Sequence, residues 1–316
     1  METRITGMAA AALVVAAGLI ALAIIKRKAA VLWILSSIIG IMVLFTSTAA
    51  LYALHIEPSM LTVTERTIIN KELPPCFEGK RVAFITDIHF GKYYKEKDFA
   101  RLAERINKLN ADILLIGGDT VDRSISPADV DPSAVAGLFK SIHAPLGMYA
   151  VEGNHDLEDR NTRAFMQRVY AEAGIRVLRN EHAFIRSGGG RIAIAGLQES
   201  YFRKPDADAA YKGIPEGTFT IGMIHEPDIA VQFTPHRTPL VLAGHSHGGI
   251  VVLPFMGPLF KVWDAKNMTK GVYKAGDTEV YVSNGIGFVI IKARFCDPPE
   301  IVVYTLKRKV INLMHQ

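Results

Sequence analysis

The chain has 316 residues, enough for one large domain or two small ones, and 49% of them are hydrophobic. That share is too high for an ordinary soluble enzyme and indicates a membrane-associated chain, because the excess lies at one end. The formal net charge of +5 fits a domain held near anionic lipid headgroups, or a mildly basic surface without specific meaning. We expect no nucleic-acid partner.

The N-terminal part contains two apolar segments without charged residues, at residues 5–25 and 29–56. Each is long enough to cross a hydrocarbon core of about 30 Å as a helix. A cleaved signal peptide is the alternative for the first segment, but only one arginine precedes it and a second apolar segment follows at once. Residues 1–56 are therefore predicted to form a membrane anchor of two transmembrane helices.

The turn between these segments is basic and consists of Lys26, Arg27 and Lys28. Positive charge favours the cytoplasmic side, which places both the N-terminus and the rest of the chain on the outer face of the cell membrane. Further cations follow the second segment within about 25 residues and weaken this bias. The predicted location is thus the cell membrane, with the globular part outside.

Residues 57–75 are predicted to form an extended linker with one strand at residues 61–69. Pro74 and Pro75 mark the entry into a globular domain at residues 76–316. The two cysteines, Cys76 and Cys296, lie too far apart in sequence for a metal-binding knuckle. They would pair in an oxidising compartment, or remain two buried free thiols.

Strands and helices alternate in the first half of the domain. Buried strands are predicted at residues 81–86, 112–116 and 147–151, and helices at 97–109, 132–142 and 162–173. This alternation is typical of parallel strands joined by helices, in which ligands collect at the carboxyl ends of the strands.

Short strands dominate after residue 174, and Ser187 to Gly190 is predicted to be the turn of a hairpin. The predicted strands are residues 176–178, 183–186, 191–197, 219–225, 240–243, 271–274, 279–282 and 300–306. Two sheets that face each other, with helices outside, fit this pattern.

Five short motifs with metal-ligating side chains follow the predicted strands in order. They are Asp87-Ile-His89, Gly118-Asp119-Thr-Val-Asp122, Gly153-Asn154-His155-Asp156, His225 and Gly244-His245-Ser-His247. Each motif alone is weak evidence, because a turn, a helix cap or a core histidine has the same appearance. Together they supply the mixed oxygen and imidazole ligands of a two-metal hydrolase.

This ordered set resembles the calcineurin-like metallophosphoesterase superfamily, over roughly residues 80 to 305. The resemblance implies a four-layer α/β/β/α sandwich that hydrolyses phosphate esters with two divalent metal ions. The chain is most similar to the bacterial membrane-associated branch, since Gly248-Gly249 leads into Val251-Val-Leu-Pro-Phe255. Position 250 is isoleucine, where this family is expected to have a polar residue such as glutamine. The difference concerns the part of the site that faces the substrate and leaves the metal ligands intact.

The resemblance also implies a role for each motif residue. One metal would be bound by Asp87, His89, Asp119 and His247, and the other by Asp119, Asn154, His225 and His245. His155 would act on the leaving-group oxygen, and Asp156 would hydrogen-bond and orient His155. The role of Asp122 stays open between a turn cap and catalysis. Mixed histidine, aspartate and asparagine ligands suit Mn, Fe, Zn or Co better than Mg or Ca, and we expect manganese to work in an assay.

The apolar segment at residues 253–260 follows the last motif. We expect an ordinary buried loop there, with an exposed lip that meets acyl chains or the bilayer as the alternative. Residues 284–287 (Asn-Gly-Ile-Gly) resemble a late loop that approaches the site in this family.

The predicted function is hydrolysis of a phosphodiester or pyrophosphate at the membrane surface, with a lipid-linked substrate as the natural inference from the anchor. The branch is similar to UDP-2,3-diacylglucosamine hydrolases, whose role requires a cytoplasmic domain, so envelope phospholipids and cell-wall phosphodiesters are equal candidates. The competing interpretations are a non-catalytic metal-binding scaffold for protein interactions and a metal-dependent protein phosphatase.

Overall fold

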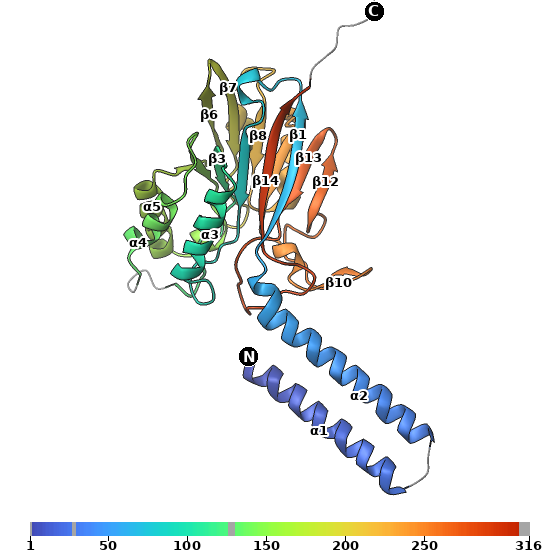
Figure 1. Ribbon diagram of the computed structural model, residues 1–316. Helices are drawn as coiled ribbons and strands as arrows, with labels where there is room; N and C mark the ends of the chain where they lie inside the picture. Colours follow the sequence, from blue (N-terminus) through green and yellow to red (C-terminus); the bar gives the residue numbers. More distant parts are fainter. Residues whose placement is uncertain (1, 27–29, 126–129, 310–316) are drawn as a thin grey trace, which may run out of the picture.

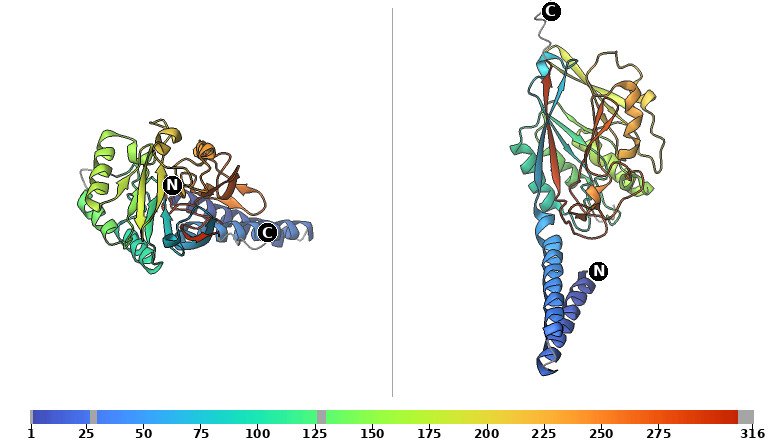
Figure 2. Two further views of the ribbon diagram at one scale, coloured as in Figure 1. Left: turned by 90° about the horizontal axis from the view of Figure 1, so that it is seen from above. Right: turned by 90° about the vertical axis from the view of Figure 1, so that its right-hand side faces the viewer.

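The computed structural model describes residues 2–26, 30–125 and 130–309 (Figure 1). An N-terminal pair of helices stands apart from a domain that contains two six-stranded sheets (Figure 2). The sequence-based expectation of two sheets is confirmed.

The first sheet is mixed and has the strand order β1-β14-β2-β3-β4-β5. Strands β2 to β5 run parallel, as the alternation of strands and helices predicts, and β14 is antiparallel to β2 but parallel to β1. The bounds are β1 Thr62–Asn70, β14 Glu300–Arg308, β2 Arg81–Ile85, β3 Ile113–Ile116, β4 Met148–Ala150 and β5 Arg176–Val177.

The second sheet has the order β12-β13-β9-β8-β7-β6. Its three central pairs are parallel, and a hairpin closes each edge, including the predicted turn between β6 and β7. The bounds are β12 Gly271–Ala275, β13 Thr278–Val282, β9 Leu240–Ala243, β8 Thr220–Met223, β7 Gly190–Gly196 and β6 Glu181–Ser187.

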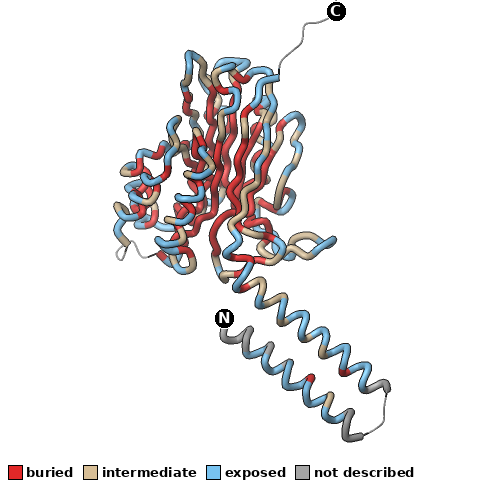
Figure 3. The backbone as a smooth tube through the Cα atoms, in the orientation of Figure 1, coloured by how far each residue is buried: buried red, intermediate tan, exposed pale blue. Residues whose placement is uncertain are grey.

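Alternate residues of each central strand point to opposite faces of its sheet, so the sheets have apolar side chains on both faces. In β2, Val82 and Phe84 pack in the core between the two sheets, whereas Ala83 and Ile85 pack beneath helices on the outer face. Figure 3 shows these strands as the buried centre of the domain. Burial on both faces explains why the strand sequences are continuous apolar runs.

Helices cover both outer faces of the sandwich. The first sheet is covered by α3 (Glu96–Lys108), α4 (Pro132–Lys140) and α5 (Arg160–Ala173). The second is covered by α6 (Ala207–Tyr211) and a 3-10 segment, Pro227–His236. Helices α3 to α5 lie close to their predicted positions, and the four-layer arrangement is confirmed.

The predicted linker contains a strand of the sandwich. Strand β1 pairs with β14 in register from Thr62 to Asn70, so it forms the edge of the first sheet. Residues 62–70 are therefore part of the globular structure, because the exposed edge of β14 offers them backbone partners that local sequence does not reveal.

The N-terminal helices are α1 (Glu2–Lys26) and α2 (Ala30–Leu51), and α2 continues through a π-type turn at Tyr52–Ile56. Among the described residues, one helical segment, Trp33–Ser59, is long and apolar enough to cross a membrane, with a mean hydropathy of 2.1. Helix α1 contributes a shorter apolar stretch, Leu13–Leu22. The prediction of two membrane spans is not confirmed.

Two other expectations are wrong. The cysteines are neither paired nor both buried, since Cys76 is half-buried and Cys296 is exposed.

Residues 253–260 do not form a buried loop: β10 (Val252–Leu253) and β11 (Gly257–Pro258) make a projecting hairpin whose tip residue, Phe255, is fully exposed. The two strands form a sheet of their own, and beyond it the base of β10 bonds the backbone of Phe295.

Candidate metal centre

The predicted ligands follow the carboxyl ends of five strands from the two sheets. They are Asp87 and His89 after β2, Asp119 after β3, Asn154 after β4, His225 after β8, and His245 and His247 after β9. Parallel strands place their carboxyl ends at one edge of a sheet, and the two facing sheets bring both edges together. The fold therefore gathers residues that lie up to 160 positions apart.

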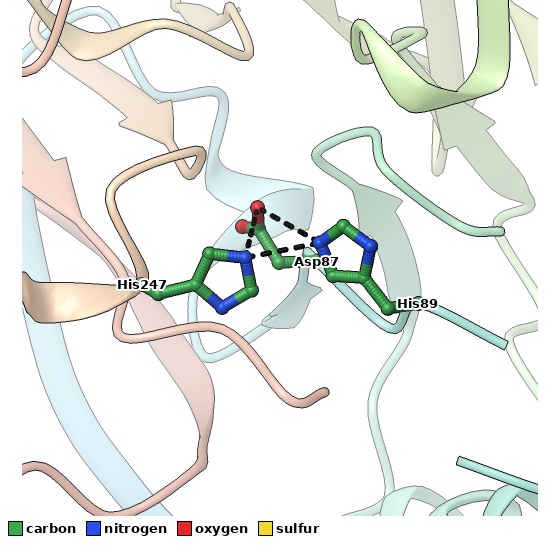
Figure 4. Close-up of side chains that lie close together, drawn as sticks. All are labelled: Asp87, His89 and His247. Atoms are coloured by element: carbon green, nitrogen blue, oxygen red, sulfur yellow. Dashed lines mark hydrogen bonds and ion pairs between the residues drawn. The ribbon is translucent and has the colours of Figure 1, made fainter. Parts of the chain in front are cut away.

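One group of potential ligand atoms comprises Asp87, His89 and His247 (Figure 4). The Nε2 atoms of His89 and His247 lie 3.0 Å apart, and Asp87 Oδ1 lies 4.0 Å and 3.5 Å from them. All three residues are buried. Only one of the facing ring nitrogens can carry a hydrogen, so at least one lone pair points at its neighbour.

A second group comprises Asp119, His225 and His245. His225 Nδ1 lies 2.7 Å from the carbonyl oxygen of Gly117, and His245 Nε2 lies 2.9 Å from that of Trp263. Because a carbonyl only accepts hydrogen bonds, both nitrogens carry hydrogen. In the neutral rings, His225 Nε2 and His245 Nδ1 are then left with free lone pairs.

Asp119 joins the two groups. Its Oδ2 lies 3.7 Å from His89 Nε2 and 3.2 Å from His225 Nε2, and its Oδ1 accepts a hydrogen bond of 2.8 Å from the backbone amide of His155. The amide fixes one carboxylate oxygen while the other faces both groups. This position between the groups is what the sequence-based assignment of a shared ligand requires.

Burial keeps most of the imidazoles neutral. It lowers the pKa of His89 to about 3 and that of His245 to about 4, and it lowers the pKa of His247 well below its usual value. At neutral pH these rings are unprotonated and have lone pairs available for a cation.

Asp119 and His225 behave differently because they face each other. Burial opposes charge on both, but the imidazole of His225 holds the pKa of Asp119 well below its usual range, and Asp119 raises the pKa of His225. Burial raises the pKa of Asp87 to about 6. Buried carboxylates of this kind are stabilised by positive charge placed beside them.

The backbone is strained at five of the seven predicted ligands. The φ angle is 53° at Asp87, 48° at His89, 50° at Asp119, 67° at His245 and 49° at His247, all in the left-handed region that side chains rarely adopt. Each such residue costs of order 1–3 kcal/mol, and this kind of strain persists at functional sites.

Glycines make room for these side chains. A Cβ atom on Gly153 would clash with the carboxylate of Asp119, and one on Gly244 would clash with Thr86 and with the carboxylate of Asp87. Any other residue at either position would displace a carboxylate. The glycines of the motifs are thus required by close packing against the cluster.

The donor set fits divalent metal ions. Asn154 Oδ1 is buried and makes no hydrogen bond to a described residue, and buried His225 Nε2 faces Asp119 Oδ2 at 3.2 Å. Buried polar atoms of this kind cost free energy unless something pairs with them, and a cation suits both an amide oxygen and an imidazole lone pair. Nitrogen and oxygen donors without a thiolate match transition metals of the first row.

His155 lies beside the cluster. The structure also groups it with His89 and Asp119 as a potential ligand, and its Nδ1 lies 3.3 Å from Glu158 Oε2. The geometry therefore fits either a ligand or a proton donor, and its predicted role in catalysis stays a prediction.

Asp156 does not orient His155 in the expected way. Its Oδ1 accepts hydrogen bonds from the amides of Thr120 and Val121, and its Oδ2 from that of Gly153. The expected contact is replaced because three backbone amides already bond both oxygens of this carboxylate. Asp156 instead ties the turn after β3 to the turn after β4.

Asp122 acts as a cap. Its Oδ1 accepts a hydrogen bond of 2.8 Å from the amide of Ser124, while Oδ2 lies 4.0 Å from His89 Nδ1 without bonding it. The capping interpretation is thus supported by a contact, and the second oxygen faces the outer nitrogen of a predicted ligand.

Sequence reasoning missed several residues that support the cluster. Thr86 donates to Asp87 Oδ2 at 2.8 Å, and the hydroxyl of Tyr201 lies 3.3 Å from His245 Nε2. Buried Arg294 donates to the carbonyl of His247 at 3.1 Å. The threonine directly precedes a motif, but the other two lie outside all the motifs, so no local signal identifies them.

Comparison with known proteins agrees with this site. The sequence profile of calcineurin-like phosphoesterases matches residues 80–249, which is more than half of the chain and includes every predicted ligand. The chain belongs to the calcineurin-like phosphoesterase family. Membership implies a metal-dependent phosphoester hydrolase that binds divalent metal ions.

Relatives in this family come from distant organisms. The chain is 33% identical over 257 residues to the Uncharacterized metallophosphoesterase YkuE of Bacillus subtilis, a match that covers 81% of this chain and 89% of the relative. It is 28% identical over 268 residues to an Uncharacterized metallophosphoesterase of Aquifex aeolicus, covering 81% and 95%.

One relative is named as a transmembrane protein. The chain is 28% identical over 283 residues to the Transmembrane protein with metallophosphoesterase domain of Danio rerio, which covers 84% of this chain and 62% of the relative. The chain thus spans less than two thirds of that protein.

Proposed function

We propose that this protein is a membrane-anchored phosphodiesterase that hydrolyses a phosphodiester or pyrophosphate bond of a lipid-linked substrate with two divalent metal ions. The observation that carries the proposal is the buried cluster of aspartate and histidine side chains described above. The apolar segment Trp33–Ser59 and the membrane-named relative support the anchor.

In this proposal Asp87, His89, Asp119 and His247 hold one ion, and Asp119, Asn154, His225 and His245 hold the other. When bound, such ions supply Lewis acidity to the phosphoryl oxygens and make a water nucleophilic near neutral pH. Asp119 belongs to both sets because its free oxygen faces His89 and His225.

His155 is the proposed proton donor to the leaving group. Its Nδ1 lies 3.3 Å from Glu158 Oε2, so a hydrogen on Nδ1 points at a carboxylate and Nε2 can hold the proton that is transferred. Glu158 takes the orienting role that the sequence suggested for Asp156.

The anchor is proposed to cross the cell membrane twice, through α1 and α2, with the basic turn at residues 26–28 in the cytoplasm. The positive charge of the turn supports this orientation, which places the domain on the outer face. Among the metals that suit the donor set (Mn, Fe, Zn and Co), manganese is the proposed assay metal.

The direct test is hydrolysis of bis-p-nitrophenyl phosphate and p-nitrophenyl phosphate by the full-length protein, stripped of metal and reloaded with each of the four metals. We expect cleavage of the diester only after reloading, and slower cleavage of the monoester. Cleavage of the monoester alone would contradict the phosphodiesterase. Failure to cleave either ester with metal bound would favour a binding scaffold.

Replacement of His155 by alanine separates the two interpretations of its position. If His155 donates a proton, metal content stays near that of the wild type and kcat falls by roughly 10²–10⁴-fold, most for esters with poor leaving groups. Metal content by mass spectrometry and kcat for a series of leaving groups are the measurements. The exposed His143 provides a matched control, His143→Ala. Loss of metal from His155→Ala would instead make His155 a ligand.

A further inference from the structure

The surface next to the metal centre carries a group of exposed apolar side chains that we name the apolar lip. It consists of Phe255, Met256, Leu259, Phe260 and Trp263, with exposed fractions of 109%, 78%, 50%, 61% and 63%. The lip comprises the tip of the hairpin formed by β10 and β11 and the segment that follows it. Contiguous exposed apolar side chains of this kind mark an interaction surface.

The phenylalanine at the tip of the lip does not stabilise the domain itself. Phe255 has a φ angle of 67°, a strained conformation for a bulky residue, and its side chain packs against nothing. Asparagine or glycine would suit this turn better. The phenylalanine is thus unfavourable for the folded domain, which indicates that it contacts something outside the domain.

The charges around the lip favour an anionic surface. Residues 251–263 contain no acidic residue, and exposed Lys261 and Lys266 lie on either side of Trp263 in the sequence, with Asp264 as the one acidic residue between them. The ammonium group of Lys266 lies 4.0 Å from the centre of the Trp263 ring. Exposed aromatic side chains beside lysines are typical of proteins that dip into the headgroup region of a bilayer.

The end of α2 is fixed to the domain, so the domain has one orientation relative to this helix. The carboxylate of Glu57, which is 1% exposed, accepts hydrogen bonds from the amides of Cys296, at 2.9 Å, and Asp297. The amide of Arg294 donates to the carbonyl of Ala53 at 2.9 Å. These bonds leave no flexible linker between helix and domain.

The lip and α2 share one end of the domain. In Figure 1 the hairpin with β10 projects from the end of the domain at which α2 leaves, and the side view in Figure 2 agrees. A bilayer crossed by α2 would therefore lie beneath the lip.

We propose that the apolar lip inserts into the headgroup region of the membrane that α2 crosses, and so forms a second membrane contact beside the metal centre. The carbonyl of Trp263 is bonded to His245, so this contact lies next to a predicted metal ligand. The proposal rests on the membrane anchor of the proposed function. It deepens that function by bringing the site to the level of lipid headgroups.

The chain offers a direct probe, because Trp33 in α2 and Trp263 in the lip are its two tryptophans. The experiment uses the full-length variant Trp33→Phe, reconstituted in vesicles of three parts phosphatidylcholine to one part phosphatidylglycerol. Lipids that carry a spin label on the headgroup or high on the acyl chain are then added as quenchers. We expect them to lower the emission of Trp263 by about half, as for an aromatic side chain at the headgroup boundary.

Two further variants, made in the Trp33→Phe background, test the lip itself. Phe255→Asn combined with Phe260→Ser removes its apolar tip and suits the turn at residue 255, so we expect less quenching of Trp263. Ile69→Ser is the matched control, since Ile69 is 59% exposed near the end of β1, the strand that runs away from α2. Hydrolysis of the soluble diester by both variants reports that the domain remains folded and active.

The anchor is tested separately through Trp263→Phe, in which Trp33 alone emits. Quenching of Trp33 without quenching of Trp263 would overturn the lip proposal while keeping the anchor. Absence of quenching at both positions would remove the anchor and the lip together, and diester hydrolysis would still report the enzyme. The emission of Trp263 could instead be blue-shifted without being quenched by the labelled lipids, with a blue shift that grows as the protein-to-lipid ratio increases. That result would assign the lip to contact with a second copy of the chain.

Discussion

Replacing Asp119 with asparagine is expected to abolish phosphodiester hydrolysis, with a loss in kcat of roughly 10³-fold or more. The physical reason is its position, since Oδ2 faces both His89 and His225. Asparagine keeps the shape but removes the negative charge and turns one oxygen into an NH₂ group without a lone pair. Metal content should fall at both sites, because this side chain belongs to both proposed ligand sets.

The asparagine variant is expected to remain folded. Residue 119 has a φ angle of 50°, a conformation that asparagine tolerates well. The rate of diester cleavage and the metal content by mass spectrometry are the two measurements. Asp208→Asn, at a side chain that is 94% exposed, is the control and should match the wild type. Turnover at the wild-type rate in Asp119→Asn would refute the shared ligand.

The second large effect is expected at Arg294, whose replacement by methionine should destabilise the domain by roughly 3–5 kcal/mol. The guanidinium is 1% exposed and donates to the carbonyls of Asn284 at 2.7 Å, His247 at 3.1 Å and Gly287 at 3.0 Å, and to Asp297 Oδ2 at 3.2 Å. Methionine fills a similar space but removes the donor from the carbonyls of Asn284 and Gly287, while the carbonyl of His247 keeps the amide of Ile250 and Asp297 keeps Lys270. The loss of free energy follows from those unpaired groups.

Chemical denaturation of the full-length protein in detergent, followed by circular dichroism, measures this effect. Arg294→Lys should lie between the wild type and Arg294→Met, because one ammonium group cannot reproduce the planar set of donors. Arg101→Met is the control, since the Arg101 side chain is 66% exposed and its ion pair is long, at 3.9 Å. A midpoint for Arg294→Met equal to that of the wild type would contradict the role assigned to the guanidinium.

Arg294 also links the turn that follows α2 to the candidate metal centre. Its own amide donates to the carbonyl of Ala53, in the π-type turn that follows α2, and its side chain donates to the carbonyl of His247. Arg294 therefore contacts both the turn after α2 and the loop that carries His247. No motif surrounds it, which explains why sequence reasoning passed over it.

The layers of the fold could be predicted because each central strand is a short apolar run bounded by polar residues. In Val82 to Ile85 the side chains alternate between the inter-sheet core and the helix layer, and both environments are apolar, so the whole run is hydrophobic. The place of β1 at the edge of the first sheet was harder to predict, because its pairing with β14 joins positions that are 238 residues apart. Nothing local to β1 specifies that partner.

The sequence by itself determined the residues that gather at the candidate metal centre, because coordination chemistry restricts them to a few side-chain types and the motifs follow strands in a fixed order. Tertiary structure alone decided which groups support them: Glu158 beside His155, Asp156 on backbone amides, and Arg294 behind His247. It also decided that the segment around Phe255 is exposed and lies at the end of the domain where α2 leaves. These outcomes depend on which surfaces meet after folding, and contacts between distant segments leave no pattern in the local sequence.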